Sequence, residues 1–138
     1  MIYLDHAATV ALCPEALEAM LPFLTEQYGN PSALYESGRR ARQALAAARK
    51  SLAETLGCLP EELYFTSGGT EANNWALLAM AEAARERGDK PFLVATEIEH
   101  HAVLETLRYG KKAGVLEFAL LPVSREGRAD LGAAKALL

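Results

Sequence analysis

The first apolar pattern of the chain has helical spacing. Pro14 is a favourable first-turn residue, and the apolar positions that follow it at steps of three, one and three are Leu17, Met20, Leu21 and Leu24. This spacing predicts a helix over residues 14–28. Pro22 lacks an N–H group and is expected to kink or interrupt that helix.

A second helical pattern follows the turn chemistry of residues 29–32. Apolar side chains at steps of four, three, four and four share one helix face, namely Ala41, Leu45, Ala48, Leu52 and Leu56. The pattern predicts a long helix over residues 36–57. Gly57 is expected to cap its C-terminus, since glycine adopts the left-handed conformation readily.

From residue 63 onward, short apolar runs alternate with helical patterns. Residues 63–66, 92–95 and 115–121 are predicted strands, and residues 70–87, about 101–112 and the segment after Asp130 are predicted helices. This β-α-β-α-β-α order is typical of an α/β fold, a mostly parallel sheet flanked by helices. We therefore expect an N-terminal extended and helical segment over residues 1–57 and an incomplete α/β domain over residues 58–138.

Composition narrows the function classes. The 138 residues are 51% hydrophobic and 23% charged, which is ordinary for a globular domain. The net charge of −4 is spread along the chain, so neither a nucleic acid nor a membrane is an expected partner. Without a recognisable signal sequence, a cytoplasmic location is expected. Cys13 and Cys58 have no neighbouring ligands and are expected to be small buried side chains.

The run from Phe65 to Asn74 joins a predicted strand to a predicted helix through Gly68 and Gly69. Glycines allow a tight turn and the close approach of another group, and the helix N-terminus adds free N–H groups and a positive dipole end. Thr70 can add a hydroxyl. The run is neither a Walker loop nor a dinucleotide fingerprint. Phosphate binding and a simple helix cap both remain open.

A second polar run, residues 97–103, follows the strand predicted over 92–95 and contains His100 and His101. It lies at the carboxyl edge, where open α/β sheets bind ligands. An imidazole there could stack on a flat aromatic ligand or transfer protons. Adjacent side chains are expected to point in different directions, so no metal site is predicted, and His101 is expected to face solvent.

Four segments together carry a family resemblance: residues 3–9 (YLDHAAT), 29–32 (GNPS), 66–74 (TSGGTEANN) and 99–103 (EHHAV). Their order and separation resemble the N-terminal part of the cysteine desulfurases. These enzymes belong to the class V aminotransferase group of the fold-type-I enzymes that use pyridoxal 5′-phosphate (PLP). The resemblance extends over essentially the whole chain, and it implies part of the fold-type-I large domain.

The resemblance also implies roles for individual residues. Gly69 and Thr70 would hold the PLP phosphate, and His100 would stack on the pyridine ring and help to move protons. The residues lining the substrate end of the pocket would be Ala7, Ala8 and Thr9. This sequence departs from the family pattern at His6, Val10, Ala11 and Tyr35, which affects the substrate side rather than the phosphate cradle.

The rest of the family's machinery has no counterpart in these 138 residues. The family's covalent PLP lysine and persulfide-forming cysteine have no matching motif, so covalent PLP attachment and activity are not expected of this chain alone. The implied reaction converts L-cysteine to L-alanine and passes sulfur towards iron–sulfur cluster or thio-cofactor synthesis. Expected partners are a second copy of the chain, a separately encoded C-terminal portion, or a sulfur-acceptor protein. Alternatives are another class V relative, such as a selenocysteine lyase, and a truncated non-catalytic binding or assembly protein.

Overall fold

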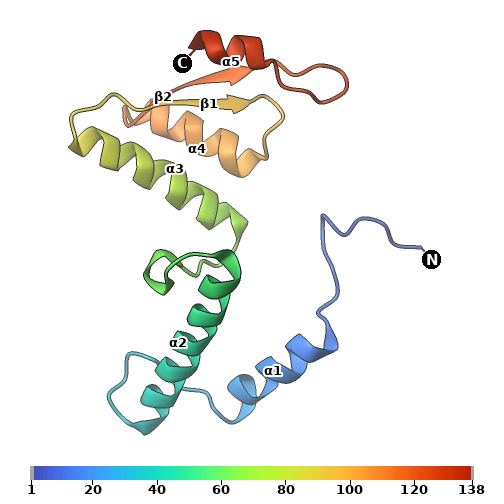
Figure 1. Ribbon diagram of the computed structural model, residues 1–138, viewed down its shortest axis with the longest axis vertical. Coiled ribbons are helices and arrows are strands. Elements are labelled where there is room, and N and C mark those ends of the chain that lie inside the picture. Colours follow the sequence, from blue (N-terminus) through green and yellow to red (C-terminus); the bar gives the residue numbers. More distant parts are fainter. Residues whose placement is uncertain (1, 138) are drawn as a thin grey trace. The chain divides into compact units, whose positions relative to one another are not determined.

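The computed structural model describes residues 2–137 (Figure 1). These residues form two compact units, and the boundary along the chain falls between Tyr64 and Phe65. The described part of the chain contains no helix that is both long enough and apolar enough to cross a membrane. Both units contain helices, whereas the strands of the described residues lie only after residue 90.

The first unit is helical. Helix α1 (Pro14–Thr25) starts at Pro14 as predicted, accommodates Pro22 inside it, and ends three residues before the predicted limit. Helix α2 (Glu36–Leu56) matches its prediction, and Gly57 caps it in the left-handed conformation with φ 71°. A short 3-10 turn, η1 (Pro60–Glu62), packs against α2.

The predicted strand over residues 63–66 is wrong. Leu63 is extended, with φ −100° and ψ 122°, but the segment from Leu63 to Thr66 joins no sheet. A strand is stabilised by backbone pairing with a neighbour, and the sheet in the described residues consists of two other strands. The apolar run therefore has strand-like conformation without strand pairing.

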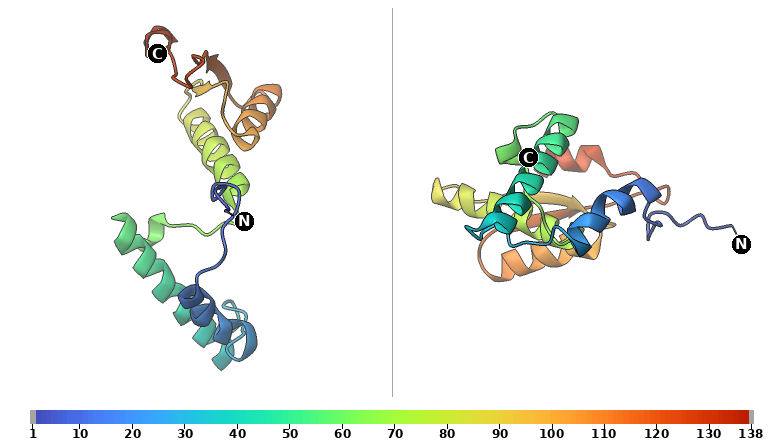
Figure 2. Two further views of the ribbon diagram at one scale, coloured as in Figure 1. Left: turned by 90° about the vertical axis from the view of Figure 1, so that its right-hand side faces the viewer. Right: turned by 90° about the horizontal axis from the view of Figure 1, so that it is seen from below.

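The second unit is a compact α/β arrangement. Its elements are α3 (Gly69–Glu86), β1 (Phe92–Thr96), α4 (His101–Lys112), β2 (Glu117–Leu121) and α5 (Leu131–Leu137). The two strands pair in parallel, with Phe92 opposite Glu117 and Thr96 opposite Leu121. Helix α4 supplies the crossover, and α4 and α5 lie on opposite sides of the strands (Figures 1 and 2). The predicted α/β class with a parallel sheet is confirmed.

The core of this unit lies where α3, α4 and the start of β2 meet. Ala81, Leu107 and Leu116 are almost fully buried, and the apolar side chains of both strands pack against them. Asp130 begins α5 as predicted, since its Oδ1 accepts hydrogen bonds from the backbone N–H groups of Gly132 and Ala133. This packing places the N-termini of α3 and α4 in one compact unit, and both predicted cofactor segments lie there.

Cys13 differs from its prediction. It is exposed at the N-cap of α1, whereas Cys58 is partly buried, and both are free thiols. The expectation of two buried cysteines is therefore wrong for Cys13, because neither α1 nor the described residues before it contribute a buried side chain.

Candidate functional site

The N-terminus of α3 is built around two glycines. Gly68 is the N-cap in an extended conformation, φ 167° and ψ 177°, and Gly69 is the first helical residue. A Cβ atom added at either position would meet nothing within 4 Å. Neither an unusual dihedral angle nor packing within the described chain requires glycine here. The two glycines instead leave open space over the helix N-terminus, which a phosphate group needs for close approach.

Donors converge on the same place. The first-turn N–H groups of Gly69, Thr70 and Glu71 have no acceptor within the helix, and Gly68 provides no capping side chain. Thr70 adds a hydroxyl in the first turn. Together with the helix dipole, these groups suit a dianionic phosphate. The chemistry of the donor set therefore fits the phosphate of PLP.

Glu71 organises the turn before the helix. Its Oε2 accepts hydrogen bonds from both the backbone N–H and the side-chain Oγ of Ser67, each 2.6 Å long. These hydrogen bonds, the hydroxyl one foremost, hold the pKa of the Glu71 carboxyl below its ordinary value. The carboxylate thus fixes the shape of the turn that leads into the glycines.

An open groove begins at this turn and runs along α3. Its volume is about 750 Å³, with Ser67, Thr70 and Glu71 at the polar end. Its walls are mostly apolar, and the large side chains in them include Trp75, Leu78 and Tyr109. The apolar walls are a surface that further polypeptide could cover. His100 does not line this groove.

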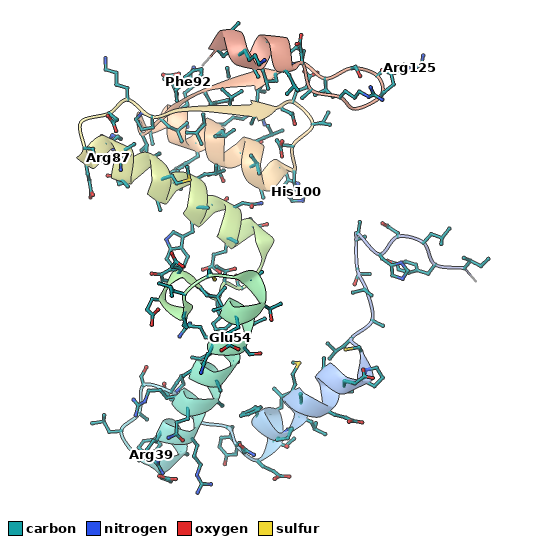
Figure 3. The ribbon with its side chains drawn as sticks, in the orientation of Figure 1. Arg39, Glu54, Arg87, Phe92, His100 and Arg125 are labelled. Atoms are coloured by element: carbon teal, nitrogen blue, oxygen red, sulfur yellow. The ribbon has the colours of Figure 1, made fainter. Side chains whose placement is uncertain are left out.

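His100 lies at the beginning of α4, where Figure 3 labels it. It is the N-cap residue, and its Nδ1 accepts a 3.1 Å hydrogen bond from the backbone N–H of Ala102. In the neutral imidazole the proton must then be on Nε2, which is left as a donor. The side chain is exposed, so the ring can meet a ligand.

The expectation that His100 and His101 point in different directions is wrong. Their ring centroids lie 3.9 Å apart, and the ring planes are tilted by 33°. The alternation of a strand does not apply, because His100 is an N-cap residue and His101 is already helical. Among residues 2–137, no three His, Cys, Asp or Glu side chains gather as they would around a metal ion.

The predicted substrate-lining residues belong to the first unit. Ala7 and Ala8 lie in an exposed turn, which the Ala8 N–H closes by donating to Asp5 O at 3.1 Å. The Tyr3 hydroxyl braces the turn by donating to Asp5 O at 2.7 Å, and it lies 3.2 Å from Thr9 O. The turn presents small side chains on its surface, and its role in a pocket remains a prediction.

The sequence interpretation missed Asn74, which links the two helices of the candidate site. Its side-chain amide contacts the first turn of α3 and the first turn of α4. A signal was present, because asparagine is a weak helix former, and Asn74 stands four residues after Thr70 on the same helix face.

Comparison with known proteins identifies the family. A family model described as aminotransferase class-V matches residues 2–138. The chain belongs to the aminotransferase class-V family. The resemblance inferred from the four sequence segments is thereby confirmed, and so is the fold-type-I character of the second unit.

Relatives within this family narrow the resemblance. A cysteine desulfurase, IscS, of Methanosarcina thermophila is 44% identical over 126 residues, which is 91% of this chain and 30% of that protein. A solved NifS-like protein superposes with a TM-score of 0.89 at 36% identity, covering 99% of this chain and 37% of the other. A structure described as SspA in complex with cysteine gives a TM-score of 0.84 at 30% identity, covering 99% of this chain and 38% of that chain. This chain therefore spans about a third of the length of these relatives.

Proposed function

We propose that this chain forms the phosphate-binding part of a PLP-dependent cysteine desulfurase, with residues 58–138 as the incomplete PLP-binding domain. The observation that carries the proposal is the N-terminus of α3, where Gly68 and Gly69 leave room for a group outside the described chain. The desulfurase relatives favour cysteine over other class-V substrates.

In this proposal, the backbone of Gly69 and the hydroxyl and N–H of Thr70 bind the PLP phosphate. His100 stacks on the pyridine ring, and its Nε2 holds or moves a proton, since Nδ1 is engaged with Ala102. Ala7, Ala8 and Thr9 line the substrate end. PLP, when bound, supplies an electron sink for breaking bonds to the substrate's α-carbon and β-carbon. The sulfur of L-cysteine then passes to an enzyme cysteine as a persulfide, with L-alanine as the other product.

A sulfur-acceptor protein and a destination in iron–sulfur cluster or thio-cofactor synthesis complete the proposal. The remaining catalytic groups would come from further polypeptide, covalently continuous or separate. A second copy of the chain is proposed as an additional partner. The apolar walls of the α3 groove support such partners, because Trp75 and Tyr109 keep about half or more of their surface exposed.

The test measures, by absorbance, the binding of PLP to the completed protein, meaning this chain together with the polypeptide that supplies the remaining groups. Pyridoxal serves as the ligand that lacks phosphate. Thr70→Val removes one hydrogen bond to a charged group, which corresponds to about 1.5–3 kcal/mol, or roughly 10-fold to 150-fold in affinity. Thr55→Val makes the same change on the exposed face of α2 and should leave binding unchanged.

Pyridoxal should distinguish the phosphate cradle from other contacts. Thr70→Val is expected to weaken PLP much more than pyridoxal, because only PLP carries the group that Thr70 would hold. Equal affinities of the wild type and Thr70→Val for PLP would show that the turn is only a helix cap.

A further inference from the structure

The amide of Asn74 joins two helix starts. Two backbone carbonyl oxygens face one end of this amide, so that end must be the donor, Nδ2. Nδ2 lies 3.2 Å from Thr70 O in the first turn of α3 and 3.0 Å from Ala102 O in the first turn of α4. One side chain thus ties the turn that carries Thr70 to the turn that follows His100.

Thr106 completes this link. Its hydroxyl donates to Ala102 O at 2.7 Å and contacts the Asn74 amide. Thr106 is buried, with 6% of its surface exposed, and it lies one helical turn after Ala102. A buried polar network of this kind holds a single geometry when its members are satisfied.

The link reaches His100 through Ala102. Asn74 and Thr106 both hold the carbonyl of Ala102, and the N–H of the same residue donates to His100 Nδ1. We infer that Asn74 and Thr106 are positioning residues that fix the His100 ring, and its Nε2–H tautomer, relative to Thr70. The inference rests on the proposed function, in which Thr70 holds the phosphate and His100 faces the ring.

A packing role alone does not explain why polar residues occupy positions 74 and 106. Helices α3 and α4 already pack through Ala81 and Leu107, which are both almost fully buried. Asparagine and threonine are poorer helix formers than alanine or leucine, and two apolar side chains could fill the same space. What an apolar pair could not supply is a directional bond to the turn beside His100.

The experiment follows the ring tautomer of His100 in the completed protein without PLP. Protein with ¹⁵N-labelled histidine is examined by long-range ¹H–¹⁵N spectra above pH 8, and His100→Gln identifies the signal. The wild type should show Nε2–H alone. Asn74→Ala and Thr106→Val should give a mixture of both tautomers. Thr106→Ser keeps the hydroxyl and should restore the wild-type spectrum.

Cooperative thermal unfolding shows which variants are folded. If Asn74→Ala does not fold, the test relies on Thr106→Val, which is the more conservative change. Wild-type spectra in folded Thr106→Val would overturn the inference and leave the proposed function standing. A changed tautomer in a protein that does not bind PLP would support the positioning role and contradict the proposed function. In the enzyme with PLP bound, misplacement of the His100 ring should lower kcat by about 10-fold or more without a matching change in KM.

Discussion

Gly110 of α4 lies directly against the side chain of Leu116. A Cβ atom at position 110 would stand 2.7 Å from Leu116 Cδ2 and 2.8 Å from Leu116 Cγ, closer than carbon atoms approach in folded proteins. Leu116 is part of the core of the second unit, so it has little room to move. The absence of a side chain at Gly110 therefore lets the end of α4 pack onto the start of β2.

Gly110→Ala should consequently destabilise the protein. Overpacking costs about 1–3 kcal/mol, and the better helix propensity of alanine offsets about 1 kcal/mol of it. We expect a lower midpoint in urea unfolding. Gly69→Ala is the matched control, because it changes a helical glycine with nothing within 4 Å and should leave the midpoint unchanged or slightly raised. A midpoint for Gly110→Ala at or above the wild-type value would contradict the packing described.

Gly38→Ala tests how the turn of residues 29–32 docks on α2. A Cβ atom there would lie 2.5 Å from Ala33 O and 2.8 Å from Asn30 O, both backbone atoms. Backbone yields less than a side-chain end, so a loss of about 1–3 kcal/mol is expected. Ser37→Ala, an exposed neighbour, should have little effect in the same thermal unfolding assay. Equal melting temperatures for the two variants would show that the turn is not held against α2.

The fold could be predicted wherever local rules decide it. Gly57 ends α2 because a left-handed residue, φ 71°, closes the helix, and that preference is visible in the sequence. The segment from Leu63 to Thr66 could not be assigned correctly, since its apolar composition favours a strand but pairing depends on residues elsewhere. The same limit applies to the site. Gly69 at a helix start follows from the glycine pattern. The weak helix propensity of asparagine marks Asn74 in the sequence, but it does not reveal the partner Thr106, which lies 32 positions away.

Acid should weaken the turn before α3. The pKa of Glu71 is lowered in the folded protein by its hydrogen bonds from Ser67. A lowered carboxyl pKa stabilises the fold above the unfolded value, about 4.3, and this contribution disappears as the pH falls through the lower folded pKa. Glu71→Gln should remove that pH dependence. NMR titration of the Glu71 carboxyl gives the direct measurement, and a folded pKa at or above the ordinary value would contradict this prediction.

Covalent attachment of PLP to the 138-residue chain alone is not expected. The family's lysine motif has no counterpart in these 138 residues. After incubation with PLP and borohydride reduction, peptide mass spectrometry should find no stoichiometric adduct at a single lysine. Cysteine should release no sulfide in the same sample. One fully modified lysine with sulfide release would contradict the prediction.

The chain should associate with further polypeptide. The sheet of the second unit consists of β1 and β2, and the outer edge of each strand carries backbone donors and acceptors. Large apolar side chains also remain exposed in both units, among them Leu24, Leu56 and Met80. Pairing with a second copy, or with a separate C-terminal portion, would continue the sheet and cover these apolar side chains.

Light scattering of the purified 138-residue chain at micromolar concentration tests this association. We expect either a mass above that of a monomer, or a monomer that unfolds without cooperativity until its partner is added. The second outcome would identify a C-terminal portion as the partner, because a chain that dimerises with itself needs no other polypeptide to unfold cooperatively. A monomer with a sharp thermal transition would contradict the prediction, since it would show that two strands and their helices satisfy the sheet edges unaided.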